Sequence, residues 1–474
     1  MEQTLLQIAY LVASVLFIFS LKGLSSQETA RQGNVNGMIG MGIAVIATLF
    51  NSKVNQYDTL LLTICLGSVI GYLMAARVQM TQMPELVALL HSFVGAAAVL
   101  VGLASDRSMG SALGHEPSVL YAWEIGIDIF IGALTFTGSV VAFLKLQGKV
   151  NSKPYLHPLR HQINIGLTAT SLLLITLYSM NLCCATADNP GGPWEYLLAM
   201  TVLSGILGAH LVMAIGGADM PVVVSMLNSY SGWTASAAGF MLSNDLLIIT
   251  GALVGSSGAI LSYIMCKSMN RSIWSVIFGG FGAEPASAPK TPVVQTDLTV
   301  QEIDCSGLTE ALCAAKSVVI VPGYGMAQAR AQHAVYDLCT DLKKKGVNVR
   351  FAIHPVAGRL PGHMNILLAE ADVPYDIVFE LHDINDDFPE TDVVLVIGAN
   401  DIVNPLAQED PTCSIGGMEV LEVWKSKLTV IFKRSRNVGY AGIDNPLFYK
   451  ENSKMFFGDA AESVKKVVAE VRGS

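Results

Sequence analysis

Apolar residues gather in long runs along the first 280 residues of the chain. The runs lie at residues 4–21, 35–50, 59–76, 83–104, 118–145, 161–180, 195–215, 220–241 and 245–266. A helix needs about 20 residues to cross the hydrocarbon core of a membrane, so most of these runs are long enough to span it. The pattern predicts a multi-span α-helical membrane bundle of about nine helices over residues 1–281.

Basic residues are distributed unevenly between the connecting loops. Loops that follow odd-numbered runs carry Lys22, Arg31, Arg77, Lys145, Lys149, Lys153, Arg160, Lys267 and Arg271, whereas the alternate loops carry only Lys53 and Arg107. Positive loops stay in the cytoplasm, so we expect an N-terminus outside and the chain beyond residue 266 inside. The first run lacks a basic leader and a small-residue cleavage site, and we expect it to be retained as a span.

The fourth run carries His91, Gly95, Ala98 and Gly102 at steps of three and four residues. These residues form one stripe of a helix, small enough for close packing against a neighbour, so the imidazole should face the bundle interior. An ionisable group inside a bilayer is a functional candidate by default, and histidine changes its charge near neutral pH. His91 is therefore either a proton relay or a neutral histidine that bonds across helices.

Other spans also carry small or polar residues. The eighth run has Ser225, Asn228, Ser231, Gly232 and Ala235, entered from Asp219, and the ninth has Gly251, Gly255, Ser256, Ser257 and Gly258. For His210 we favour a structural role, because it has fewer small neighbours. Glu124 and Asp128, at i and i+4 of the fifth run, either line a wet cavity or lie near the interface.

Residues 282–300 are rich in Pro, Ala, Ser and Thr and predict a linker. Beyond it, residues 301–474 alternate strand and helix patterns. Strands are predicted at Ser317–Val321, Val347–Ile353, Ile377–Phe379, Val393–Ile397 and Leu428–Phe432, with a helix reaching about Lys345 after the first of them. This alternation predicts a C-terminal α/β domain with a Rossmann-like, doubly wound parallel sheet.

A glycine-containing turn, Pro322–Ala327, follows the first predicted strand. Glycine at 323 and 325 lets phosphate oxygens approach backbone N–H groups at the start of a helix. The third position of the G-x-G-x-x-G pattern is Gln328, so the fingerprint is incomplete and indicates a dinucleotide mainly through its place between strand and helix.

The choice between the two nicotinamide dinucleotides follows from the strand ends. The second strand ends in Ile353-His354-Pro355, without the carboxylate that usually holds the ribose of NAD. The triplet Lys433-Arg434-Ser435 directly follows the 428–432 strand and suits a 2′-phosphate, although it could be a solvated charge cluster. NADP(H) is therefore preferred over NAD(H).

Composition excludes several other classes of protein. The chain is 52% hydrophobic and 14% charged, with a net charge of −9, and this acidic balance argues against a nucleic-acid partner. Its eight cysteines include no CxxC spacing, so neither a disulfide framework nor a zinc site is expected, and no metal is predicted.

The longer motifs resemble a known family. They are ALLHSFVG around His91, GADMPVVVSMLNSYSGW at 217–233, GALVGSSGAILSYIMCK at 251–267, VPGYGMA at 321–327, HPVAGRLPGHMN at 354–365, IGANDIVNP at 397–405 and FKRSRNVGYAGIDNPLF at 432–448. With these motifs the chain closely resembles the beta subunit of proton-translocating NAD(P)+ transhydrogenase over nearly its whole length.

This resemblance implies an enzyme that transfers hydride between NADH and NADP+ while protons cross the membrane inward. NAD(H) would be bound by an alpha subunit, since only one glycine fingerprint is present here, and the chain would be inactive alone. A dimer of alpha–beta units in the bacterial cytoplasmic (inner) membrane is expected, with the NADP(H)-binding domain in the cytoplasm.

The resemblance also implies roles for individual residues. His91 and Asn228 would lie on the proton path, with Asp219 near its cytoplasmic end. Gly323, Gly325 and Ala327 would cradle the pyrophosphate with Arg359, and Lys433, Arg434 and Ser435 would hold the 2′-phosphate. Asp401 would lie near the nicotinamide and Tyr440 in a lid over the nucleotide. Further cofactor contacts are expected from Tyr324, Met326, His354, Asn400, Gly439 and Ala441.

Two other functions remain open from the sequence. One is a transporter gated by an NADP-sensing domain, which would move a solute without hydride exchange. The other is a membrane-anchored dehydrogenase with its own substrate, which needs a catalytic His, Lys or Tyr beside the nicotinamide. Asp401 and His354 suit that role poorly.

Overall fold

A computed structural model describes most of the chain in two compact units. The described residues are 2–24, 29–50, 56–108, 118–151, 154–155, 157–183, 193–277, 300–359, 362–411, 413, 415–439 and 441–474. One unit comprises Met1–Ile215 and Val223–Leu261, and the other comprises Gly216–Val222 and Ser262–Ser474. The predicted linker 282–300 lies, except for Val300, outside the described residues.

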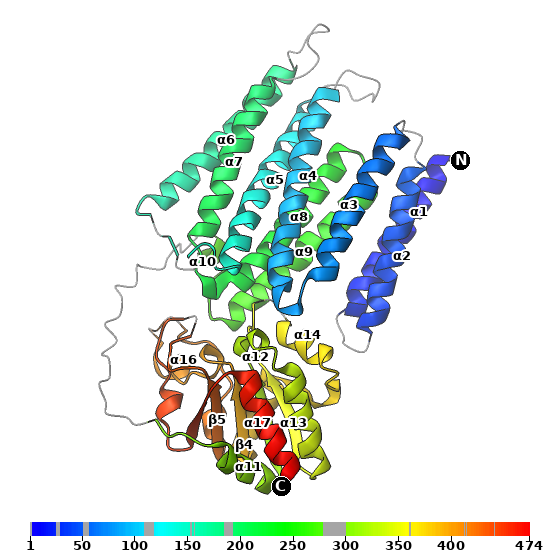
Figure 1. Cartoon of the computed structure of the whole chain (residues 1–474). Coiled ribbons are helices and arrows are strands. Elements are labelled where there is room, and N and C mark those ends of the chain that lie inside the picture. Colours follow the sequence, from blue (N-terminus) through cyan, green and yellow to red (C-terminus); the bar gives the residue numbers. More distant parts are fainter. Residues whose placement is uncertain are drawn as a thin grey trace. The chain divides into compact units, whose positions relative to one another are not determined.

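Long helices make up the N-terminal unit (Figure 1). They are α1 (Glu2–Leu24), α2 (Ala30–Leu49), α3 (Tyr57–Arg77), α4 (Met83–Ser108), α5 (Val119–Leu146), α6 (Arg160–Cys183), α7 (Trp194–Met213), α8 (Met220–Met241) and α9 (Asp245–Ser268). The short α10 (Ile273–Ile277) follows and belongs to the other unit. In the described part of the chain, seven of these helices are long and apolar enough to cross a membrane, and α2 and α8 are not among them. Both are nevertheless 20 residues or longer. The predicted membrane bundle is confirmed.

Small residues bring pairs of these helices into close contact. A Cβ atom built on Gly95 of α4 would lie 2.6 Å from the carbonyl oxygen of Gly132 in α5, and one on Gly102 would lie 2.6 Å from Ile129. The same holds between α8 and α9, where a Cβ on Gly232 would lie 2.3 Å from the backbone nitrogen of Gly255. The predicted stripe of α4 therefore packs closely, as its spacing requires.

The C-terminal domain is built on six parallel strands. These are β1 (Ser317–Pro322), β2 (Asn348–Ile353), β3 (Val378–Glu380), β4 (Val393–Ile397), β5 (Leu428–Lys433) and β6 (Ser453–Phe457), in the order β3-β2-β1-β4-β5-β6. From β1 the chain adds β2 and β3 on one side of the sheet and then β4, β5 and β6 on the other side. Open α/β sheets bind their ligands at such a switch point, here between the carboxyl ends of β1 and β4. The doubly wound sheet is confirmed, and β6 is an additional strand that the hydrophobic pattern did not predict.

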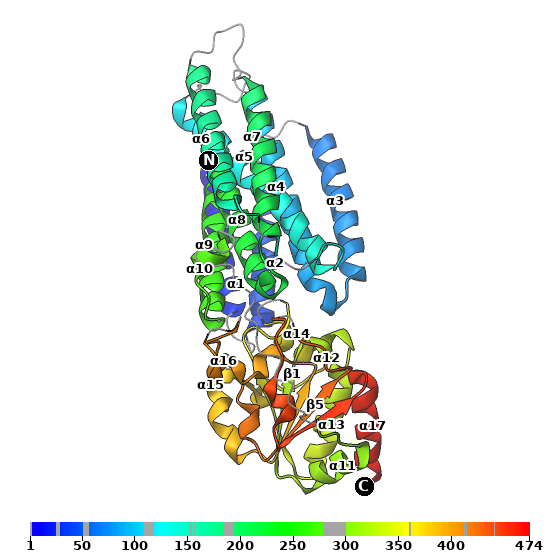
Figure 2. The ribbon, with the colours of Figure 1, turned by 90° about the vertical axis from the view of Figure 1, so that its left-hand side faces the viewer.

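Helices cover the sheet and give the domain its own core. Helix α17 (Ala460–Gly473) packs against both α11 (Cys305–Ala314) and α13 (Gln332–Lys344) beside the strands (Figures 1 and 2). Strand β4 is buried at every position, as a central parallel strand must be. An extensive apolar cluster joins the strands to these helices, so the domain has the means to fold alone.

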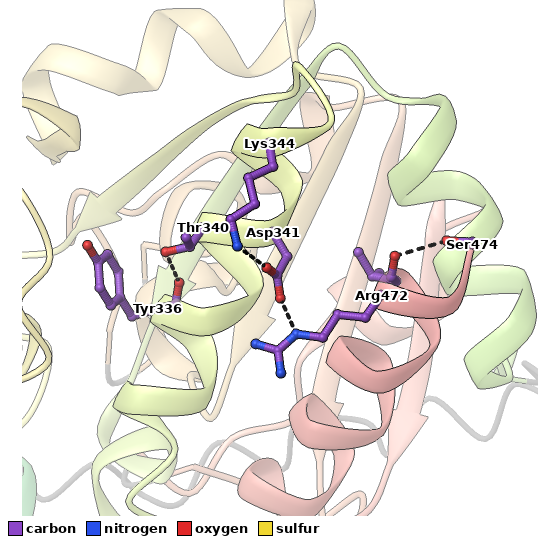
Figure 3. A network of polar contacts seen from close by, with 7 residues as sticks. Tyr336, Thr340, Asp341, Lys344, Arg472 and Ser474 are labelled. Atoms are coloured by element: carbon purple, nitrogen blue, oxygen red, sulfur yellow. Dashed lines mark hydrogen bonds and ion pairs between the residues drawn. The ribbon is translucent and has the colours of Figure 1, made fainter.

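A polar network fixes α13 to α17 (Figure 3). The Asp341 carboxylate accepts hydrogen bonds from Lys344 Nζ at 2.9 Å and from Arg472 Nε at 2.6 Å. The Lys344 and Arg472 hydrogen bonds lower the pKa of Asp341, so the carboxylate stays charged at neutral pH although the residue is buried.

One predicted helix is divided. The stretch expected to run from the glycine turn to about Lys345 consists of the short α12 (Tyr324–Gln328) and then α13. Arg330 lies between them with φ of +54°. A left-handed residue cannot continue a right-handed helix, so the first turn after β1 ends early and α13 starts on a new axis.

Candidate functional site

Most of the predicted nucleotide-binding residues lie where β1, β2, β4 and β5 end. The turn Gly323–Ala327 follows β1, His354 and Arg359 follow β2, Asn400 and Asp401 follow β4, and Lys433 is the last residue of β5. Because all the strands are parallel, their carboxyl ends share one edge of the sheet.

The glycine turn packs directly on the end of β4. The Gly323 amide donates to the Ile397 carbonyl and the Gly325 amide to the Gly398 carbonyl, both at 2.9 Å. A Cβ on Gly323 or Gly325 would lie 2.5 Å from the Gly398 oxygen or 2.7 Å from its Cα, respectively. Gly398 itself has φ of +67°, which favours glycine. Glycine is therefore required here by the meeting of two turns, whatever ligand lies above them.

Residues 437–439 and 441–445 lie against the same strand end. The Asp401 carboxylate accepts a hydrogen bond from the Ala441 amide at 3.0 Å, and a Cβ on Gly439 would lie 2.2 Å from Asp401 Oδ1. Asn445 Nδ2 donates to Asn400 at 3.0 Å. Thus Asn400, Asp401, Gly439 and Ala441 lie together, and Asn445 joins them although the motifs did not single it out; their contact with a cofactor stays a prediction.

Tyr440 lies outside the described residues, so its expected position in a lid stays a prediction. In the described part of the domain, the Nδ2 atom of Asn400 is buried and has no hydrogen-bond partner. A buried amide hydrogen without an acceptor is costly, so a polar group of a bound ligand is a natural acceptor for it.

The basic triplet is divided between a half-buried and two exposed residues. Lys433 Nζ donates to the Asn437 carbonyl at 2.6 Å and lies 4.6 Å from the centre of the Phe448 ring. Burial lowers the pKa of Lys433, while Asp401 and Asp444 act in the opposite direction. Arg434 and Ser435 are exposed, and Arg434 Nη2 donates to Asp459 at 2.7 Å. The triplet offers cations at the end of β5, where a phosphate can reach them.

Arg359 reaches back to the glycine turn. Its guanidinium carbon lies 4.3 Å from the centre of the Tyr324 ring, a cation–π distance. The Arg359 amide donates to His363 Nδ1 at 3.1 Å, so the other nitrogen, Nε2, carries the hydrogen. That nitrogen is buried without a hydrogen-bond partner among the described residues. Burial, assisted by the Arg359 charge, lowers the pKa of His363 to about 4.

His354 has a clear structural place in the loop after β2. Its Nε2 donates to the Glu419 carbonyl at 2.6 Å, and its Nδ1 accepts from the Val356 amide at 3.2 Å. Burial lowers its pKa to about 4, so the ring is neutral near pH 7. With both ring nitrogens engaged, His354 offers no free polar atom, and its predicted contact with a cofactor stays a prediction.

In the helical unit His91 bonds across helices. Its Nδ1 lies 3.1 Å from the Ser231 hydroxyl oxygen of α8, and that hydroxyl donates its hydrogen to the Asn228 carbonyl at 2.8 Å. His91 Nδ1 is therefore the donor to Ser231, and in a neutral ring Nε2 carries the lone pair. This Nε2 is buried with no hydrogen-bond partner in the described bundle. His91, Ser231 and Asn228 thus form one polar cluster, and the His91 Nε2 lone pair is its available proton acceptor.

His210 and Asp219, two further ionisable candidates, have different surroundings. His210 Nδ1 lies 2.6 Å from Asn164 Oδ1 of α6, the cross-helix bond that its structural interpretation expects. Asp219 lies in the short 3₁₀ turn Gly217–Asp219 before α8, with its carboxylate 3.9 Å from Arg271 Nε. The partner of His210, Asn164, lies near the start of α6, and the partner of Asp219, Arg271, lies just after the end of α9.

Comparison with known proteins identifies the family. The profile of the family described as the NAD(P) transhydrogenase beta subunit matches residues 6–470. Two curated sequences from Rhodospirillum rubrum, both named NAD(P) transhydrogenase subunit beta and one of them assigned to a particular strain, are each 48% identical over 474 residues. The alignment covers 99% of this chain and 99% of each relative. The chain belongs to the NAD(P) transhydrogenase beta-subunit family.

Family membership assigns the helical unit and the sheet domain to one transhydrogenase subunit. A transhydrogenase beta subunit is a membrane protein that works with nicotinamide nucleotides and has an alpha subunit as partner. The expected resemblance is confirmed over the whole chain, including both units.

Proposed function

We propose that this chain binds NADP(H) at the carboxyl edge of its sheet. With an alpha subunit that binds NAD(H), it would couple hydride transfer between NADH and NADP+ to inward proton translocation. The supporting observation is the convergence of the β1, β4 and β5 ends on one place. There the glycine turn, the buried amide of Asn400 and the Lys433 ammonium lie close to one another.

The residues fit an NADP dinucleotide. Gly323, Gly325 and Ala327 with Arg359 would face the pyrophosphate, and Lys433, Arg434 and Ser435 would hold the 2′-phosphate, because fixed cations are the strong partners of phosphate. Asn400 and Asp401 would lie beside the nicotinamide, and Tyr324, Met326, Gly439, Tyr440 and Ala441 would complete the enclosure. The bound nucleotide supplies the hydride chemistry, and the protein positions it and excludes water.

In the bundle, we assign His91 to the proton path with Asn228, and Asp219 to its cytoplasmic end. His91 Nε2 is buried without a partner among the described residues, whereas Nδ1 is held by Ser231. A proton bound at Nε2 would leave the Ser231 bond unchanged and would add a positive charge inside the bundle. Coupling requires that this charge alter the affinities for NADP+ and NADPH unequally.

The available energy is sufficient for such coupling. A proton that crosses a potential of about 150 mV releases about 3.5 kcal/mol. At about 1.4 kcal/mol per factor of ten, this displaces an equilibrium by a few hundredfold. The proposed complex, a dimer of alpha–beta units in the bacterial inner membrane with the N-terminus outside, could therefore drive the reduction of NADP+.

Reconstitution tests the proposal directly. Vesicles containing the chain together with its alpha subunit should show hydride exchange between NADH and an NADP+ analogue and a pH change inside, both lost when either subunit is left out. An NADP-gated transporter would instead move solute without hydride exchange. A membrane-anchored dehydrogenase would reduce or oxidise its own substrate without the alpha subunit.

A further inference from the structure

The helical unit contains a second buried ionisable side chain, on α5. Asp128 is fully buried, and both oxygens of its carboxyl group have no hydrogen-bond partner in the described part of the bundle. Its side chain points toward α4, since a Cβ on Gly102 would lie 3.6 Å from Asp128 Oδ2. The helix turns on both sides of Asp128 carry the buried core residues Ile125 and Ile129.

A charged carboxylate is strongly disfavoured in such surroundings. It would need a cation, hydrogen-bond donors or water to replace the solvent that it lost. Asp128 forms no ion pair with any described Lys or Arg, and Arg107, the cation at the end of α4, is exposed. The neutral carboxyl group, with a bound proton, is therefore the favoured form.

Other titratable groups face the same region from each neighbouring helix. On α4, buried Asp106 accepts a 2.6 Å hydrogen bond from the Tyr178 hydroxyl of α6. Tyr196 of α7 packs on the same apolar cluster as Ile125 and Ile129. On α5 itself, Tyr121 and Glu124 lie toward the N-terminus, with Glu124 one turn before Asp128. None of these groups supplies a positive charge.

Asp128 is separate from the His91 cluster. Gly102, which Asp128 faces, lies 11 residues after His91 on α4, or about 16 Å along the helix. Between these two levels, Gly95 contacts the backbone of Gly132 so closely that a single Cβ atom would overlap it. Asp128 and His91 are therefore two distinct sites for a proton.

We propose that Asp128 is a second proton-binding residue of the bundle, loaded from the side of the membrane where α5 begins. Its carboxylate would take up a proton from a water molecule as a carboxyl O–H and would release that proton to water again. This inference rests on the proposed proton translocation.

A carboxyl-directed reagent tests the proton-bound form without any substitution. Dicyclohexylcarbodiimide is apolar and attacks protonated carboxyl groups. In vesicles holding the complete alpha–beta complex, we expect it to modify the peptide that contains Asp128, with mass spectrometry placing the adduct on that residue. The modification should diminish as the pH is raised and should be absent from Asp128→Asn. An unmodified Asp128 at every pH would contradict the proposal.

Turnover supplies the second readout. Asp128→Asn keeps the shape but cannot bind or release a proton, so proton-coupled hydride exchange should fall by on the order of a hundredfold. Asp128→Glu should restore much of it, with a shifted pH profile, and NADP(H) binding should be unchanged in both. A structural role would instead leave the pH profile of Asp128→Asn parallel to that of the wild type.

The failures of the two proposals are distinguishable. If wild-type vesicles exchange hydride but move no protons, the proposed function is wrong. If they move protons and Asp128→Asn does so at the wild-type rate, only the role of Asp128 is wrong. Should Asp128→Asn fail to fold, the carbodiimide result on the wild-type complex still decides the question.

Discussion

The guanidinium of Arg359 lies over the Tyr324 ring, with 4.3 Å between the guanidinium carbon and the ring centre. This contact joins the loop after β2 to the turn after β1, two segments that are 35 residues apart in the sequence. It holds a cation beside the glycine turn before any ligand is bound. Because the side chain is already ordered, less conformational entropy is lost when a phosphate binds.

Arg359→Ala should therefore weaken NADP(H) binding to the C-terminal domain. A hydrogen bond to a charged group contributes about 1.5–3 kcal/mol, so the Kd should rise by about 10- to 100-fold. Lys450→Ala is the matched control, because Lys450 also lies over a ring, that of Trp424 at 5.8 Å, but outside the proposed site. Titration calorimetry measures both, and an unchanged Kd in Arg359→Ala would remove Arg359 from the site.

The basic triplet should determine the preference for the phosphorylated nucleotide. Arg434→Ala is expected to weaken NADP+ binding by on the order of tenfold and to leave NAD+ binding unchanged, because only NADP+ carries the 2′-phosphate. Arg436→Ala is a suitable control, since Arg436 is an equally exposed arginine two residues further along the loop. Equal weakening for both nucleotides would indicate that Arg434 supports the loop, for instance through Asp459, and does not read the phosphate.

Sequence patterns predicted the sheet far better than the details of its edge. Continuous apolar runs marked β1, β4 and β5 because central parallel strands are buried on both faces. β6 was missed because the segment Ser453–Phe457 begins with Ser and Lys and has only three apolar residues. The break at Arg330 was also missed, since a positive φ at arginine leaves no signal in the hydrophobic period.

The site residues divide in the same way. Gly323 and Gly325 follow a predicted strand, so the pattern itself marked them as site candidates, whereas Asp401 was indicated only by the family resemblance. The role of His354 could not be inferred from composition, because its partner, the Glu419 carbonyl, is 65 residues away and belongs to the backbone. Asp128 remained ambiguous for a similar reason, since periodicity does not show whether a neighbouring helix carries a glycine or a cation.

The two buried histidines of the domain predict a dependence of its stability on pH. His354 and His363 have pKa values of about 4 in the folded state, compared with about 6.5 in an unfolded chain. The unfolded state therefore binds more protons between these values, and stability falls as the pH is lowered through that window. Each histidine should contribute a loss of up to about 2 kcal/mol between pH 7 and pH 5.

Urea unfolding of the separate C-terminal domain at several pH values measures this loss. His354→Gln keeps a side-chain donor but cannot titrate, so the slope of stability against pH should be about half that of the wild type. His333→Asn, at an exposed position on α13, should leave the slope unchanged. A wild-type domain equally stable at pH 7 and pH 5 would show that the two rings become charged in the fold without cost.

His91 provides the most direct test of coupling. His91→Ala removes the open Nε2 acceptor and leaves the Ser231 hydroxyl with its bond to the Asn228 carbonyl. In vesicles with the alpha subunit, we expect coupled hydride exchange and proton movement to fall together by on the order of a hundredfold, while NADP(H) still binds to the sheet domain. Ser231→Ala serves as the comparison, because it removes the partner of Nδ1 but keeps the imidazole, and it should retain more activity than His91→Ala. Normal proton pumping by His91→Ala would mean that the histidine only joins α4 to α8, and the proton path would then have to be sought along other polar residues of the bundle.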